Sequence, residues 1–212
     1  MASTLRRLGL ALVIGASLAE AAQPAKPLAQ AQMEALALAG ETAVRHARLA
    51  AHDESPLRFE FHRRQAFVVK LGDVPVQVMS LSWWPQSGGD AHCALVVKSA
   101  SATSQHADVP VIDALAGAAD DPPWSCDGEP ALRFTDVNDD GCTDLVALFP
   151  MRPPSGERFW QPVVLTCTGK GSLAFEQSLT KQLTGHQPLH DLQQAVQWLK
   201  PRTDSSSRPG SR

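Results

Sequence analysis

Oxygen-bearing side chains recur at close, regular spacing in one stretch of this 212-residue chain. Three of them lie two residues apart, a glycine (Gly141) follows, and a further carboxylate closes the series. Oxygens that converge from such spacing suit a hard cation such as Ca²⁺, and glycine supplies the positive φ that a tight metal loop needs. The predicted ligands are the side chains of Asp136, Asn138, Asp140 and Asp144 and the backbone carbonyl of Cys142.

The residues around this loop predict strands rather than helices. A helical EF-hand loop ends with a bidentate Glu at its twelfth position, and counting from Asp136 that position is Ala147. Residues 145–149 form a short apolar run, which is typical of a buried strand. The sequence therefore predicts a strand, a metal loop and a strand. A solvated acidic turn without metal is the alternative interpretation.

Other residues with catalytic potential form no familiar constellation. The chain contains no G-x-S-x-G, H-E-x-x-H or glycine-rich phosphate motif. His92 lies beside Cys93, and His186 and His190 lie four residues apart with Pro188 between them. A structural strand-edge histidine and a solvated helix start explain these pairs more simply than a catalytic or transition-metal site. We therefore predict a binding protein rather than an enzyme.

The N-terminus has the pattern of an export signal. Arg6 and Arg7 precede an apolar run over residues 8–18, and Ala19-Glu20-Ala21 offers a cleavage site between small residues. This pattern predicts a secretory signal peptide over residues 1–21 and a periplasmic protein, because the apolar run is too short to span a membrane. Cleavage changes the net charge from −3 to about −4. No basic face indicates nucleic acid.

The chain has an even number of cysteines, which in an exported protein indicates two disulfides. Four free thiols are the alternative, and no C-x-x-C spacing favours zinc. Residues 143–149 and 161–168 both have strand character. A hairpin of these strands centred near Ser155 places Cys142 opposite Cys167. We therefore favour a Cys142–Cys167 bridge, which leaves Cys93 to pair with Cys126.

The remaining segments predict a β-rich domain between two helices. Residues 33–51 and 189–199 have helical spacing of apolar residues. Further strands are predicted at 57–61, 66–71, 74–81, 92–99, 131–135 and 173–175. The predicted fold is mainly β with an N-terminal and a C-terminal peripheral helix, as a partial propeller-like or meander sheet with one strand–calcium loop–strand unit. We expect a flexible leader at 22–30, a single calcium-binding domain at 31–200 and a disordered tail at 201–212.

The stretch from Phe134 to Leu145 resembles the FG-GAP or VCBS repeats of extracellular β-proteins, whose core reads roughly F-x-D-x-N-x-D-G-x-x-D-L. It departs from them at Asp139, where such repeats often carry glycine. The resemblance implies a calcium loop. A complete propeller is not expected, because the chain shows no second copy.

Residues 124–201 resemble exported bacterial proteins that carry one such loop, then an aromatic strand (here Phe159-Trp160) and a late helix. Some of these proteins look like immunity proteins of type IV secretion killing systems, which inhibit peptidoglycan hydrolases in the periplasm. The resemblance implies a hydrolase as the protein partner.

The proline-rich segment 150–158 is the best candidate contact with such a partner, because prolines pre-order its backbone. We expect the calcium loop and the Cys142–Cys167 bridge to hold the base of this segment. The predicted partner-binding residues are Arg152, Glu157, Arg158 and Trp160. The alternative function is a cell-wall or carbohydrate-binding envelope module, whose candidate surface is Trp83, Trp84, Phe159 and Trp160.

Overall fold

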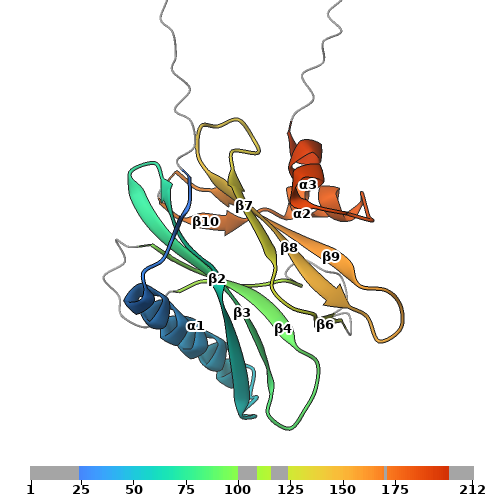
Figure 1. Ribbon diagram of the computed structural model, residues 1–212. Helices are drawn as coiled ribbons and strands as arrows, with labels where there is room; N and C mark the ends of the chain where they lie inside the picture. The colour runs from blue at the N-terminus through green and yellow to red at the C-terminus, as the bar shows by residue number, and fades with distance from the viewer. Residues whose placement is uncertain (1–23, 100–108, 116–123, 170, 201–212) are drawn as a thin grey trace, which may run out of the picture.

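The computed structural model describes residues 24–99, 109–115, 124–169 and 171–200, and Figure 1 shows their arrangement. The predicted signal peptide and the predicted C-terminal tail lie outside these residues. Two antiparallel five-stranded sheets and three helices make up the described part of the chain. The prediction of a mainly β fold with peripheral helices is confirmed.

The first sheet is an antiparallel meander in which neighbours in sequence are neighbours in space. Its strands are β1 (Lys26–Pro27), β2 (Leu57–Leu71), β3 (Val74–Pro85), β4 (His92–Ser99) and β5 (Val111–Asp113). A tight turn at Gly72 joins β2 to β3, and its φ of 60° is the left-handed conformation that glycine adopts without strain.

A large β-bulge interrupts β2. Phe61 lies opposite Leu81 and Ala66 lies opposite Met79, so residues 62–65 of β2 face Ser80 alone. The bulge joins two segments that the sequence predicts as separate strands. Its extra residues let the strand change direction, which sends one side chain of the bulge into the interior and leaves others exposed.

The second sheet is built around β8 (Asp144–Arg152), which pairs with β9 (Phe159–Cys167) on one side. On the other side β8 pairs with β7 (Ala131–Thr135) near its start and with β6 (Ser125–Cys126) at its end. β10 (Leu173–Phe175) extends the sheet beyond β9. The candidate metal loop is the connection from β7 to β8.

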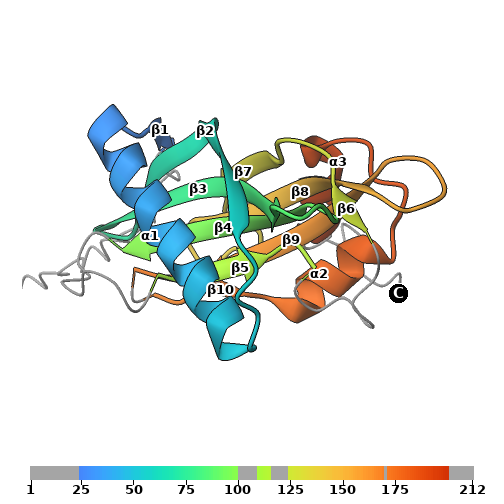
Figure 2. The same ribbon diagram turned by 90° about the horizontal axis from the view of Figure 1, so that it is seen from below.

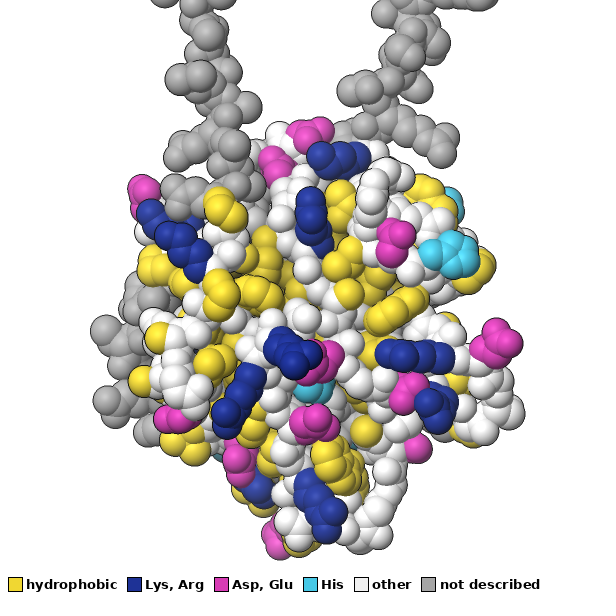
Figure 3. Space-filling model, in the orientation of Figure 1, with side chains coloured by type: hydrophobic (Ala, Val, Ile, Leu, Met, Phe, Trp, Pro, Cys, Tyr) yellow, Lys and Arg dark blue, Asp and Glu magenta, His cyan; other side chains and the backbone are white. Residues whose placement is uncertain are grey.

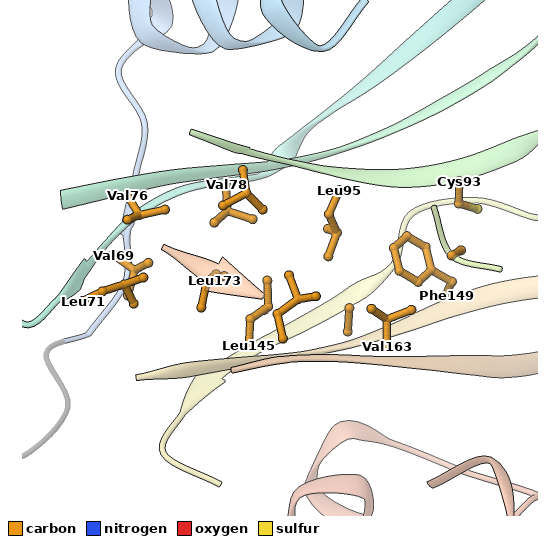
Figure 4. Packing of buried hydrophobic residues seen from close by; sticks show 14 of the residues in the cluster. Val69, Leu71, Val76, Val78, Cys93, Leu95, Leu145, Phe149, Val163 and Leu173 are labelled. Atoms are coloured by element: carbon orange, nitrogen blue, oxygen red, sulfur yellow. The ribbon is translucent and has the colours of Figure 1, made fainter. Parts of the chain in front are cut away.

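The two sheets face each other across the main hydrophobic core (Figure 4). Val76 and Val78 of β3 point toward the second sheet, and Leu145 and Phe149 of β8 and Val163 of β9 point toward the first. All five side chains are fully buried. Their alternation along each strand is the pattern expected when one face of a sheet is buried against another.

Helices cover the outer faces of both sheets (Figure 2). Helix α1 (Gln30–Ala50) packs Leu36 and Val44 on the first sheet. Helices α2 (Gln177–Thr184) and α3 (Leu192–Leu199) pack on the outer face of the second sheet. A Cβ added at Gly40 of α1 would lie 2.6 Å from Val96 Cγ2, so this glycine permits the close approach of α1 to the first sheet.

The leader prediction needs correction. Residues 26–27 form β1, and the Leu28 side chain is only 5% exposed because it packs under α1. Leu28 N also donates to Ala66 O, which ties this segment to β2. The C-terminal helix begins later than predicted, at Leu192, because the Asp191 side chain caps it by accepting from Gln194 N. The sequence prediction did not include α2.

Candidate metal loop and hairpin tip

The candidate metal loop connects two paired strands. Thr135 at the end of β7 lies opposite Asp144 at the start of β8, so the loop between them is closed at its base by the β ladder. Asp139 has a φ of 59° and Gly141 a φ of 81°. These left-handed conformations turn the chain sharply and bring the intervening side chains back over the loop.

Oxygen atoms of the predicted ligands accept hydrogen bonds from the loop's own amides. Asp136 Oδ2 accepts from Gly141 N at 2.8 Å, and Asp140 Oδ1 accepts from Cys142 N at 2.7 Å. Asn138 Nδ2 donates to Asp140 Oδ2 at 2.9 Å, and Asn138 Oδ1 accepts from Asp140 N at 3.2 Å. The side chains of all three residues therefore bond back onto the loop, although Asn138 and Asp140 are exposed.

Asp144 differs from the other three because it is fully buried. Its Oδ2 accepts from Val137 N and its Oδ1 accepts from Cys167 N, each at 2.9 Å. The carboxylate thus ties the loop, β8 and the end of β9 together. Burial raises the pKa of Asp144, the two backbone bonds oppose that rise, and the nearby charges of Asp140 and Asp136 add to it.

The composition of the loop fits a hard divalent cation. The predicted ligands supply three carboxylates and one amide oxygen on one short turn, and none of the ion pairs formed by the described residues includes them. Each carboxylate oxygen that accepts a hydrogen bond from an N–H group keeps a second lone pair for another partner. As arranged, the described residues contain no group of three or more His, Cys, Asp or Glu side chains that could hold a metal ion. A bound cation therefore requires these oxygens to move toward a common point.

Two disulfides flank the second sheet, in the pairing that the hairpin argument favours. Cys142 pairs with Cys167 with a Cα–Cα distance of 5.9 Å, and Cys93 pairs with Cys126 at 5.5 Å. The first closes the open end of the β8–β9 hairpin beside the metal loop. The second links β4 of the first sheet to β6 of the second, so it crosses the main core.

The β8–β9 hairpin ends in an exposed tip. Pro150 lies opposite Trp160 and Met151 opposite Phe159, which centres the turn at residue 155 as predicted. Residues 154–158 are exposed. Figure 3 shows that on this face of the molecule Lys and Arg side chains lie next to Asp and Glu side chains.

A single carboxylate braces the tip. Asp127 Oδ2 lies 2.8 Å from Arg152 Nη2 and 3.6 Å from Arg158 Nε. The Arg158 guanidinium also lies over the Trp160 ring, 5.3 Å from its centroid, which is within the distance of about 6 Å expected of a cation–π contact. Three of the four predicted partner-binding residues therefore meet at the base of the tip, and Glu157 is exposed beside them.

The expectation that the metal loop and the Cys142–Cys167 bridge hold the base of the tip is wrong. The metal loop and the Cys142–Cys167 bridge lie at the start of β8, whereas the tip lies at its other end. At about 3.3 Å per residue, the length of β8 separates them by roughly 25 to 30 Å. Asp127, which follows Cys126, braces the tip instead. Sequence reasoning missed Asp127, because its distance of 25 residues from Arg152 leaves no local signal.

Three of the four aromatic residues named for the alternative function pack in different parts of the fold. Trp83 is 7% exposed and packs beneath α1, where its ring stacks on His92 at 4.0 Å. Trp160 packs with the helices on the outer face of the second sheet, and Phe159 packs toward the main core. The His186 ring contacts Trp198 at 4.6 Å.

Comparison of the chain with protein-family models, with curated proteins and with solved structures found no match. Among the described residues, no helix combines the length and the apolar character needed to cross a membrane.

Proposed function

We propose that this chain is an exported, calcium-stabilised binding protein that inhibits a peptidoglycan hydrolase of the lysozyme type. The braced hairpin tip is the observation that carries the proposal. Residues 154–158 project beyond the sheet, and Arg152 and Arg158, at the two ends of the tip, share one carboxylate. A protruding loop that is ordered before binding enters a cleft at low entropic cost.

The charge of the tip supports an acidic target. Two guanidinium groups offer more N–H donors than the one carboxylate of Asp127 can accept, so donors remain for a partner. Arg152 is well placed to use them, because its side chain is 64% exposed. Lysozyme-type hydrolases work through Asp and Glu carboxylates, which arginine binds with paired hydrogen bonds.

Calcium has a structural role in this proposal. The ligands would be the side chains of Asp136, Asn138, Asp140 and Asp144 and the carbonyl of Cys142. The ion would offset the mutual repulsion of three carboxylates that no described basic side chain pairs with. It would fix the β7–β8 connection and, through Asp144, the end of β9.

Export is proposed from two features. The N-terminal pattern predicts a signal peptide over residues 1–21, and both disulfides suit an oxidising compartment such as the periplasm.

The test is hydrolysis of purified peptidoglycan by a panel of lysozyme-type hydrolases, with increasing amounts of this protein. We expect stoichiometric inhibition of at least one enzyme. Arg152→Ala should weaken that inhibition by about 2 to 5 kcal/mol if the arginine is buried against a carboxylate. Lys70→Ala is the matched control, because Lys70 is an exposed cation near the β2–β3 turn, away from the tip.

The outcomes separate the function from the contact. No inhibition of any enzyme by the unmodified protein discards the proposed function. Full inhibition by Arg152→Ala discards only the assignment of this arginine. Retention of the protein on peptidoglycan without inhibition favours the wall-binding alternative.

A further inference from the structure

A shallow seam runs between α1 and the first part of β2. We call it the α1–β2 seam, and two hollows open along it. The larger, of about 110 Å³, is lined by Arg48, Leu49 and Leu57 among other residues. The smaller, of about 40 Å³, is lined by Met33 and Phe61 among others. Both hollows therefore lie against the same two elements.

The edge of β2 along this seam is open in the part of the chain that the structure describes. Further along, β1 covers the same edge at Phe67 and Val68, and Leu28 N donates to Ala66 O. Within residues 24–99, 109–115, 124–169 and 171–200, no strand pairs with residues 57–61 on the side away from β3. β1 shows that this edge accepts a strand.

The phase of the ladder identifies the groups on the open edge. Gln86 N donates to Pro56 O at 2.7 Å, so these two residues form a hydrogen-bonded pair of β2 and β3. Backbone groups alternate in direction along an antiparallel strand. The N–H and C=O groups of Phe59 and Phe61 therefore point away from β3, toward the open edge.

Apolar surface accompanies these backbone groups. Leu49, at the rim of the larger hollow, is 55% exposed. The rings of Phe59 and Phe61 are partly exposed and stack at 6.1 Å, with the Arg45 guanidinium 5.1 Å above the Phe59 ring. The seam thus offers apolar contacts beside the outward N–H and C=O groups of Phe59 and Phe61, which pair with no strand among the described residues.

We propose that the α1–β2 seam binds an extended peptide segment of a partner protein, which pairs with the open edge of β2 and places an apolar side chain in each hollow. Only an extended backbone matches the alternating groups of a strand edge. This surface is distinct from the hairpin tip and goes beyond the proposed inhibition.

The structure sets the length and spacing of the segment. Pro56 and the bulge after Phe61 end the open edge on both sides, which leaves room for about five residues. The hollows lie at Leu57 and Phe61, four residues apart on the same face of β2. Side chains at positions i and i+4 of the segment therefore fill them.

The test begins with a library of random seven-residue peptides on phage, selected against the full chain. We expect enriched peptides with large apolar residues four positions apart. Phe59→Pro removes the outward N–H, and an edge strand tolerates proline there. Phe59→Ala removes the same ring but keeps the N–H. A selected peptide should bind Phe59→Pro at least tenfold more weakly than Phe59→Ala.

A second pair of variants tests the hollow without touching the strand. Leu49→Lys should weaken binding of the peptide at least tenfold. Leu38→Lys should leave its affinity within twofold, because Leu38 is 62% exposed on α1, against 55% for Leu49, but lines neither hollow. A library that enriches no peptide overturns the proposal, as does equal binding within either pair. If deletion of residues 201–212 raises the peptide's affinity tenfold, the chain's own tail occupies the seam and the partner assignment is wrong.

Discussion

At the scale of single residues, Asp140 gives the most direct test of the calcium site proposed for the β7–β8 loop. Binding to the folded loop alone stabilises the protein by mass action, by about 2.7 kcal/mol when free calcium is a hundredfold above Kd. We expect a Kd of about 10⁻⁴ to 10⁻³ M, because the loop lacks a bidentate Glu. Calcium should then raise Tm by roughly 5 to 10 °C. Asp140→Ala should remove most of that rise in a thermal melt.

The neighbouring carboxylate provides the matched control. Asp139 adds the same charge to the loop but is not a predicted ligand, and asparagine tolerates its φ of 59°. Asp139→Asn should therefore keep most of the calcium-dependent rise in Tm. An equal rise in the Asp140→Ala variant and the unmodified protein would refute the metal assignment.

His62 is a buried polar residue between the two sheets, and it contacts two buried serines. Its Nδ1 lies 3.0 Å from Ser80 Oγ and its Nε2 lies 3.3 Å from Ser82 Oγ. Burial lowers the pKa of His62, and the charges of Glu129 and Glu60 oppose that effect. The two hydroxyls satisfy the neutral ring, so protonation adds a buried charge without a paired carboxylate in hydrogen-bond contact.

This pKa shift predicts acid sensitivity. Above pH 6.5 the ring is neutral in both the folded and the unfolded chain, so it adds no pH dependence there. Below that value the unfolded state binds the proton first, and stability falls until the pH passes the lower folded pKa. His62→Gln should flatten the pH dependence of unfolding free energy between pH 7 and 5, measured by urea denaturation. His190→Gln, at an exposed site, should keep it.

At the scale of elements, strands bounded by turn signals were predictable and the bulge was not. β4 and β7 occupy the predicted residues, since each is a run with turn signals on both sides. The segment 62–65 reads as polar, yet His62 is 2% exposed. Its burial depends on Ser80 and Ser82 of the neighbouring strand β3. The sequence of β2 does not indicate that these serines lie opposite His62.

The role of Gly40 also could not be predicted from the sequence, and it leads to a prediction about the packing of α1. In sequence it weakens a predicted helix, by about 1 kcal/mol relative to alanine. In the structure it lets α1 approach Val96 and Leu81. Gly40→Ala should destabilise the protein by about 1 to 2 kcal/mol in chemical denaturation, because overpacking against a stiff β-branched side chain exceeds the gain in propensity.

The second variant separates packing from propensity. In Val96→Ala the added methyl has room, so Gly40→Ala should become neutral or stabilising in that background. A loss of stability that is the same in both backgrounds would place its cause within the helix rather than at its contact with β4.

At the scale of the molecule, the site divides into a local and a non-local part. The strand–loop–strand unit was predictable because its candidate ligands lie within nine consecutive residues, 136–144, and the bound ion stays a prediction. The Cys142–Cys167 pairing followed from one hairpin register. The brace at Asp127 and the open edge of β2 depend instead on how the two sheets and α1 pack, which residue spacing does not encode.

The packing of the two sheets predicts that calcium binding stabilises the first sheet as well as the second. The main core takes side chains from both sheets, and the Cys93–Cys126 bridge joins them across it. A ligand that binds one part of a cooperative unit lowers the opening of the whole unit. Calcium should therefore slow amide hydrogen exchange in β3 by a factor similar to that in β8, although the loop belongs to the second sheet. Asp140→Ala should abolish both effects. Slower exchange confined to β8 and its neighbours would instead mean that the two sheets open independently. Calcium binding at the loop would then not stabilise the first sheet.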